Sequence, residues 1–88
     1  MKNNEEFWKP EENESIEGVF IEITGNIGKY GSRIYKIRTE DKTFCVWESV
    51  ELRELFENVN PDDRIYLKYL GTEESGEYQR KKYDLKVL

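Results

Sequence analysis

Basic and aromatic side chains form the most informative pattern in this chain, because together they suit a ligand that has phosphates and flat rings. They gather in residues 29–47 and residues 78–82, on either side of the acidic stretch 48–63. Lysine and arginine can neutralise phosphates, and aromatic rings can stack on bases. The candidate site residues are Lys29, Tyr30, Arg33, Lys36, Arg38, Trp47, Tyr78, Arg80, Lys81 and Lys82.

Each candidate residue also has an ordinary structural interpretation. A lysine or arginine on an exposed strand face is usually just solvated. Trp47 is as compatible with a place at the rim of the core as with stacking on a ligand. Tyr30 and Tyr78 lie in polar segments with little core to join, which favours a binding role for these two side chains.

The net charge of −5 argues against indiscriminate binding to polyanions, but the charges are segregated along the chain. Residues 29–47 carry a net charge of +3, and residues 64–88 carry +2. Residues 1–28 and 48–63 each carry −5. Whether the basic residues form one surface therefore depends on how the fold places the two positive segments.

The composition excludes chemistry that needs histidine or several cysteines. The chain contains no histidine, and its one cysteine is Cys45. It therefore has no internal disulfide, no multi-thiolate or histidine metal site and no histidine general acid or base. The acidic pairs at residues 11–12, 62–63 and 73–74 are interpreted as solvated charge. We expect a non-enzymatic protein without metal or cofactor, in which Cys45 is an inert, partly buried thiol.

The hydrophobic pattern predicts one domain over residues 14–88, preceded by a flexible acidic lead over residues 1–13. Phe7 and Trp8 interrupt the lead, and we expect them to cover one end of the domain. Polar loops are predicted for the glycine-rich segment after the first strand and for the segment before the last strand, residues 25–31 and 71–81. Strand patterns cover residues 15–24, 32–39, 43–47, 64–70 and 82–88, and an amphipathic helix covers residues 48–59.

Strand alternation divides the residues of the second strand between two faces. Tyr35 and Ile37 are predicted to face the core, so that Lys36 and Arg38 face the opposite side. Gly18 is predicted to kink or bulge the first strand, as the closing of a small barrel requires. In the helix, Ser49 is the predicted N-cap, and the apolar stripe that faces the core consists of Leu52, Leu55, Phe56 and Val59.

The order strand–strand–strand–helix–strand–strand resembles an OB-fold, an all-β, five-stranded Greek-key barrel with one helix. The segment from Phe44 to Ile65, with Trp47 and the helix stripe, resembles replication protein A-like single-stranded DNA-binding domains. Short proteins of this kind are common in bacteriophages and prophages. Two departures add negative charge on the helix side: Asp62-Asp63, where such domains usually have Gly-Asp, and Glu48, where glycine is frequent.

The resemblance implies a function. In OB-folds of this kind the ligand crosses strands two and three, between the loop that joins strands one and two and the loop that joins strands four and five. Those segments hold the two basic blocks of this chain. The expected function is non-catalytic binding of single-stranded DNA in replication or recombination, with RNA as a variant that the sequence does not distinguish.

A protein-interaction module is the alternative, with a replication or host protein as the partner. It is motivated by the net charge of −5 and by the acidic helix face at Glu51, Glu54 and Glu57. No apolar run approaches the ~20 residues needed to span a bilayer, and the N-terminal residues do not resemble a secretory signal. We therefore expect a cytoplasmic monomer or weak homodimer that does not associate with membranes.

Overall fold

The described residues form six strands, which pair into one sheet, and one short helix. The structure, a computed structural model, describes residues 5–27, 32–76 and 78–88. The predicted all-β fold with one helix is confirmed. The helix α1 (Val50–Leu55) is followed by the 3-10 turn η1 (Phe56–Asn58). The strands are β1 (Glu5–Phe7), β2 (Ser15–Ile27), β3 (Ser32–Arg38), β4 (Thr43–Trp47), β5 (Arg64–Ser75) and β6 (Tyr78–Val87).

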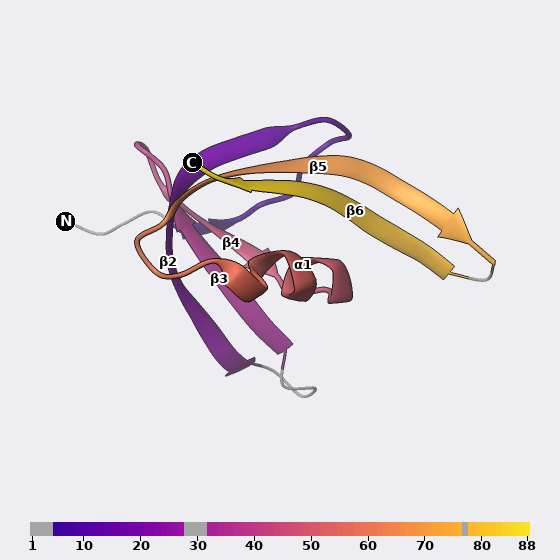
Figure 1. Cartoon of the computed structure of the whole chain (residues 1–88), viewed down its shortest axis with the longest axis horizontal. Coiled ribbons are helices and arrows are strands. Elements are labelled where there is room, and N and C mark those ends of the chain that lie inside the picture. Colours follow the sequence, from indigo (N-terminus) through magenta and orange to yellow (C-terminus); the bar gives the residue numbers. More distant parts are fainter. Residues whose placement is uncertain (1–4, 28–31, 77) are drawn as a thin grey trace.

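The order of the strands is β1-β4-β3-β2-β5-β6, with β1 parallel to β4 and the other neighbours antiparallel. The two halves of the sheet share β2. Its residues 15–19 pair with β5, and its residues 19–27 pair with β3, so the sheet turns along this strand. In Figure 1, β2 and β3 accordingly run in one direction and the β5–β6 hairpin in another.

Gly18 was predicted to kink or bulge the first strand, but the irregularity in the pairing of β2 lies elsewhere. The register between β2 and β3 shifts between Phe20 and Glu22, two residues further along the strand. The backbone of β3 instead lies close to Gly18, where a Cβ atom would clash with the carbonyl oxygen of Arg38. Glycine is therefore needed at this position for close approach of the two strands.

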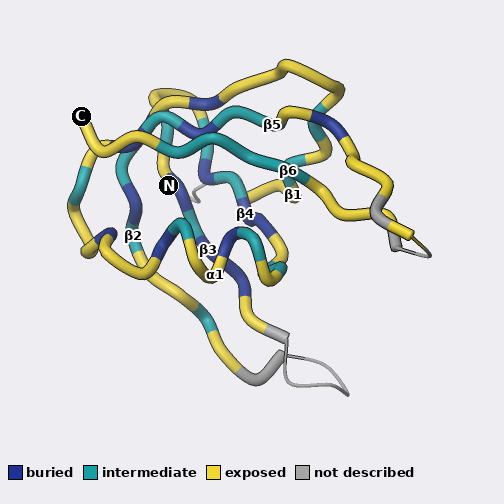
Figure 2. The backbone as a smooth tube through the Cα atoms, turned by 45° about the vertical axis from the view of Figure 1, so that its right-hand side comes forward, coloured by how far each residue is buried: buried dark blue, intermediate teal, exposed yellow. Residues whose placement is uncertain are grey.

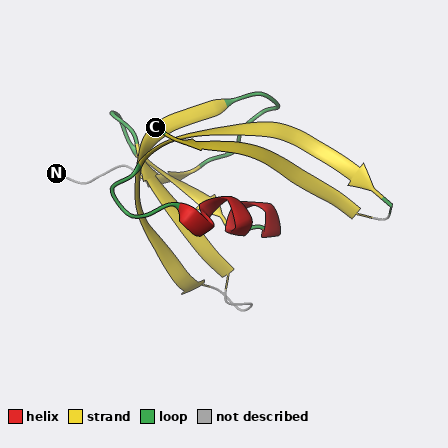
Figure 3. Cartoon of the chain, in the orientation of Figure 1, coloured by secondary structure: helices red, strands yellow, loops and turns green. Residues whose placement is uncertain are grey.

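The core lies between the curved sheet and the helix. Its buried members include Tyr35, Ile37, Leu52 and Leu67. The rings of Tyr35 and Phe56 stack with their centroids 4.3 Å apart. Figure 3 shows the helix in the opening between β3 and the β5–β6 hairpin, where its apolar stripe packs against both parts of the sheet.

The helix begins as predicted and ends earlier. The hydroxyl oxygen of Ser49 accepts a hydrogen bond from the backbone N–H of Leu52 at 3.2 Å, which confirms the N-cap. The α-helical part ends at Leu55 rather than at residue 59, because the next turn tightens into η1. Within the described ranges, no helix is long and apolar enough to cross a membrane.

The predicted five-stranded closure is not formed in the part of the chain that the structure describes. Closure would pair β4 with β6, but these strands are not neighbours in the sheet. The outer edge of β4 pairs instead with β1, so that Glu5 lies beside Thr43 and Phe7 beside Cys45. The sheet is therefore open and six-stranded, and its additional strand comes from the segment that was predicted to be a flexible lead.

Residues 8–14 cross the open side of the sheet. At one end, the backbone N–H of Trp8 donates to the carbonyl oxygen of Cys45 on β4 at 2.9 Å. At the other end, Asn13 N–H donates to the carbonyl oxygen of Tyr69 at 2.7 Å, and Tyr69 N–H donates to that of Glu14 at 2.8 Å. The Trp8 side chain is half-buried and packs against the core. This crossing segment is therefore fixed to both halves of the sheet.

The loop predicted over residues 71–81 is wrong, because most of this segment is strand. β5 continues to Ser75 and β6 begins at Tyr78, and the two strands pair along that length. Residues 71–81 form the projecting half of the β5–β6 hairpin, and those that the structure describes are almost all exposed, as Figure 2 shows. The sequence therefore had no alternation of apolar and polar residues to indicate a strand there. Gly71, with a φ of +99°, lies at the register shift where the projecting half begins.

Candidate nucleic-acid interface

The outer face of β3 and β4, opposite the core, brings three candidate residues together: Lys36, Arg38 and Trp47. Lys36 and Arg38 are successive outward residues of β3, so their Cα atoms lie ~6.6 Å apart. Both alternate with the buried Tyr35 and Ile37, as predicted. Across the two strands, the register of this face pairs Ile34 with Trp47, Lys36 with Cys45 and Arg38 with Thr43.

Trp47 forms an exposed aromatic stack with Phe7 of β1. The ring centroids are 5.2 Å apart and the ring planes are 8° from parallel. Trp47 remains 48% exposed and Phe7 42% exposed. Apolar rings with this much surface in water can accept a further flat ring. Phe7 was predicted only to cover the domain, since its pairing with a strand almost forty positions away leaves no local signal in the sequence.

Lys36 is already neutralised by acidic residues of the same chain. Its Nζ lies 3.1 Å from Glu5 Oε2 and 3.8 Å from Glu22 Oε1. The hydrogen bond to Glu5 raises the pKa of Lys36, so this side chain is charged at neutral pH. Lys42 is held in the same way, with its Nζ 3.2 Å from Glu6 Oε1. A phosphate that reaches these lysines must therefore replace carboxylates.

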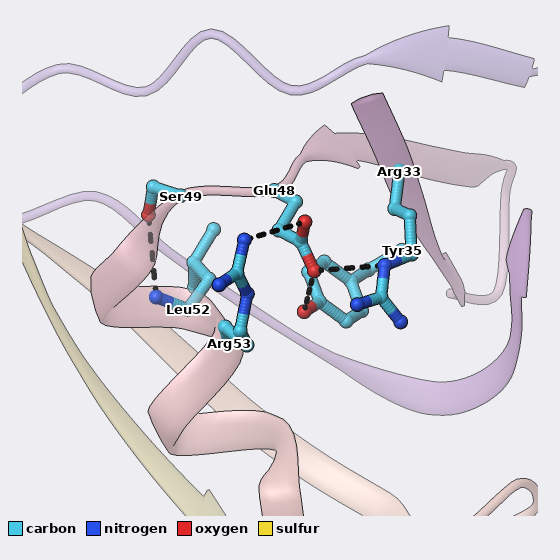
Figure 4. Close-up of polar contacts among 6 residues, drawn as sticks. All are labelled: Arg33, Tyr35, Glu48, Ser49, Leu52 and Arg53. Carbon is cyan, nitrogen blue, oxygen red and sulfur yellow. Dashed lines mark hydrogen bonds and ion pairs between the residues drawn. The ribbon is translucent and has the colours of Figure 1, made fainter. Parts of the chain in front are cut away.

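Arg33 is not brought together with Lys36 and Arg38. Its Nε lies 3.3 Å from Oε2 of Glu48, and the buried Tyr35 donates its hydroxyl to the same oxygen at 3.0 Å. From the helix, Arg53 Nη2 lies 3.3 Å from Glu48 Oε1. Figure 4 shows Glu48 between the two arginines at the junction of β4 and α1. Arg33 therefore holds this junction.

The Tyr35–Glu48 hydrogen bond predicts a pH dependence of stability. Burial and the neighbouring carboxylate raise the pKa of Tyr35 from 10.0 to about 12. Because the folded state holds this proton more tightly, the stabilisation is complete below pH 10 and is lost as the pH rises towards 12. We expect a loss of about 1 kcal/mol at pH 11 from this residue.

Urea unfolding at pH 8, 10 and 11 measures this dependence. The variant Tyr35→Phe has no phenol to ionise, so its free energy of unfolding should fall less steeply between pH 10 and 11 than that of the wild type. Equal slopes in the two proteins would show that the hydroxyl of Tyr35 ionises as easily in the folded state as in the unfolded chain.

The second basic segment is divided by the fold. Lys82 Nζ lies 3.0 Å from Glu51 Oε2, which ties β6 to the helix. Arg80 and Lys81 are exposed on the projecting hairpin and form no ion pair with any described residue. Lys29, Tyr30 and the side chain of Tyr78 lie outside the described residues, so their assignment to the site stays a prediction.

A groove of about 1210 Å³ opens between the β1–β4 edge and β6. Trp47 and Lys81 line it, so one candidate residue from each basic segment reaches the same depression. Three further aromatic residues of its lining are close to one another: the Trp8 and Tyr83 ring centroids are 6.3 Å apart, and those of Tyr69 and Tyr83 are 5.3 Å apart. These three were not predicted as site residues: Trp8 was expected to cover one end of the domain, and alternation placed Tyr83 inside a closed barrel.

Two further observations concern metal-ligating side chains and the thiol of Cys45. Among the described residues, no group of three His, Cys, Asp or Glu side chains could hold a metal ion. Cys45 is buried, and burial raises the pKa of its thiol, which keeps it protonated and unreactive. Comparisons with protein-family models, curated proteins and solved structures found no match to this chain.

Proposed function

We propose that this protein binds single-stranded nucleic acid, preferentially DNA, without catalysing a reaction. The observation that carries the proposal is the exposed Trp47 ring on the outer face of β3 and β4, the face that also carries the cations of Lys36 and Arg38. Flat rings that stack bases, next to cations that follow the phosphates, are the two requirements for binding a single strand without strict sequence preference.

We also propose that the sheet is an opened variant of the OB barrel in the style of replication protein A. Strands β2 to β6 correspond to strands one to five of such a barrel. Their order in the sheet, β4-β3-β2-β5-β6, is the order that the barrel has when it is opened between strands three and five, which are β4 and β6 here. The helix between β4 and β5 and the sharing of β2 by both halves also support this assignment.

The ligand path follows from this geometry. A single strand crosses the outer face along Lys36 and Arg38, stacks on Trp47 and enters the groove that Lys81 lines. The ammonium group of Lys36 is already paired with a carboxylate, and the protein as a whole is acidic. Few phosphates of a bound strand would therefore meet a cation that is not already paired. We therefore expect modest affinity, with about two to three phosphates neutralised.

A direct test is the fluorescence anisotropy of a labelled oligothymidine titrated with the protein at 50 and 200 mM salt. We expect binding that weakens about tenfold between the two salt concentrations, with quenching of tryptophan fluorescence. An oligouridine of the same length measures the preference for DNA. The absence of both an anisotropy change and quenching at 50 mM salt would reject the proposal.

A protein-interaction module remains the second candidate. The observations that favour it are the exposed acidic side chains of Glu54 and Glu57 and the outer edge of β6, which pairs with no described strand. Such an edge can accept an extended segment of a partner by adding a strand to the sheet. A replication or host protein that stays bound after nuclease treatment, to a protein that binds no oligothymidine, would favour this candidate.

A further inference from the structure

Two residues of β1, Glu5 and Phe7, contact the candidate site with the same kinds of interaction that a nucleic-acid strand would make. Glu5 Oε2 lies 3.1 Å from the Nζ of Lys36, as a phosphate would. Glu6 alternates to the opposite face of the strand, where it pairs with Lys42. Phe7 stacks on Trp47 in a nearly parallel arrangement, as a base would. The strand thus presents one anion and one flat ring to the basic and aromatic surface.

Strand β1 is also weakly held. It is three residues long, pairs along one edge only, and all of its residues are exposed. Exposed ion pairs contribute little to stability, and short edge segments with few buried contacts open at low free-energy cost. Its release would therefore leave the core of Tyr35, Ile37 and Leu67 unchanged.

The segment that follows β1 is held much more firmly. Trp8 packs against the core, and Asn13 and Glu14 form backbone hydrogen bonds with Tyr69. Glu12 packs against Gly71, where a Cβ atom would lie 3.1 Å from its side chain. Strand β1 is thus tethered next to its site, so after each release it returns at a high effective concentration.

We propose that β1 is a built-in competitor that occupies the nucleic-acid site and is displaced when a single strand binds. This inference rests on the proposed function. It explains how an acidic protein restricts its affinity for polyanions. Only a ligand that replaces both the Glu5 carboxylate and the Phe7 ring gains access to Lys36 and Trp47. A simple anion cannot do so.

The variant Glu5→Gln tests the competition in the full chain. It keeps the side chain isosteric and removes the carboxylate that pairs with Lys36. The control Glu17→Gln makes the same change in net charge on β2. We expect the first variant to bind oligothymidine about 3- to 10-fold more tightly than the control, with a steeper salt dependence.

The outcomes separate the two proposals. If the wild type and both variants fail to bind, the proposed function and the competition are both wrong. If the wild type binds and the two variants bind equally, the function stands and the competition is wrong.

Hydrogen exchange of the backbone amides of β1, which pairs with β4 along one edge, gives an independent measurement. Displacement predicts faster exchange of these amides with saturating oligothymidine. Unchanged or slower exchange in a protein that binds would overturn the competition.

Discussion

Replacing Trp47 by alanine is expected to weaken oligothymidine binding by about tenfold or more and to leave the protein folded. The ring is 48% exposed, so its removal takes little from the core. Stacking of one base on an aromatic ring contributes roughly 1–3 kcal/mol to binding. The anisotropy titration at 50 mM salt measures the loss, and thermal unfolding checks that the fold is retained.

Phe7→Ala is the matched control, because it removes the other ring of the same stack. If the stack were only structural, either substitution would have the same small effect on binding. Under the proposed competition the effects differ in sign: Trp47→Ala removes the platform, whereas Phe7→Ala frees it. Equal weakening of binding by both substitutions would contradict the assignment of Trp47 as the ligand platform and of Phe7 as its competitor.

The parts of the fold with strong local patterns could be predicted from the sequence. Alternation along residues 32–38 separates Tyr35 and Ile37 from Lys36 and Arg38, and the structure places them on opposite faces. Ser49 before an apolar stripe predicted the start of the helix, and its hydroxyl does cap α1. In both cases the signal lies within a few residues, where period and capping chemistry decide the structure.

The parts that depend on distant partners could not be predicted in the same way. Glu5, Glu6 and Phe7 form a strand only because the edge of β4 is available to them. The ion pairs of Arg33 with Glu48 and of Lys82 with Glu51 join residues that are far apart in the chain. Nothing in the charge count of each segment indicated that the cations were paired internally.

Gly18→Ala is expected to destabilise the protein by about 3 kcal/mol, whereas Gly25→Ala in the same strand should change stability by less than about 0.5 kcal/mol. At Gly18 a Cβ atom would clash with the Arg38 carbonyl oxygen and lie 3.1 Å from Ile37 Cγ2. At Gly25 the nearest atoms are in the flexible side chain of Arg33, at 3.8 Å. Urea unfolding of the two variants measures the difference.

Gly18→Ala should also affect the candidate site, because Gly18 packs against the backbone of Arg38. Arg38 and Lys36 form the cationic row on the outer face of β3. Moving β3 away from β2 shifts Arg38, and with it the position of Lys36 on the outer face of β3. We therefore expect folded Gly18→Ala, at low temperature, to bind oligothymidine less tightly than Gly25→Ala. Equal stability of the two variants would mean that β2 and β3 separate at little cost. In that case the bend of β2 would not be what holds the cationic row in place.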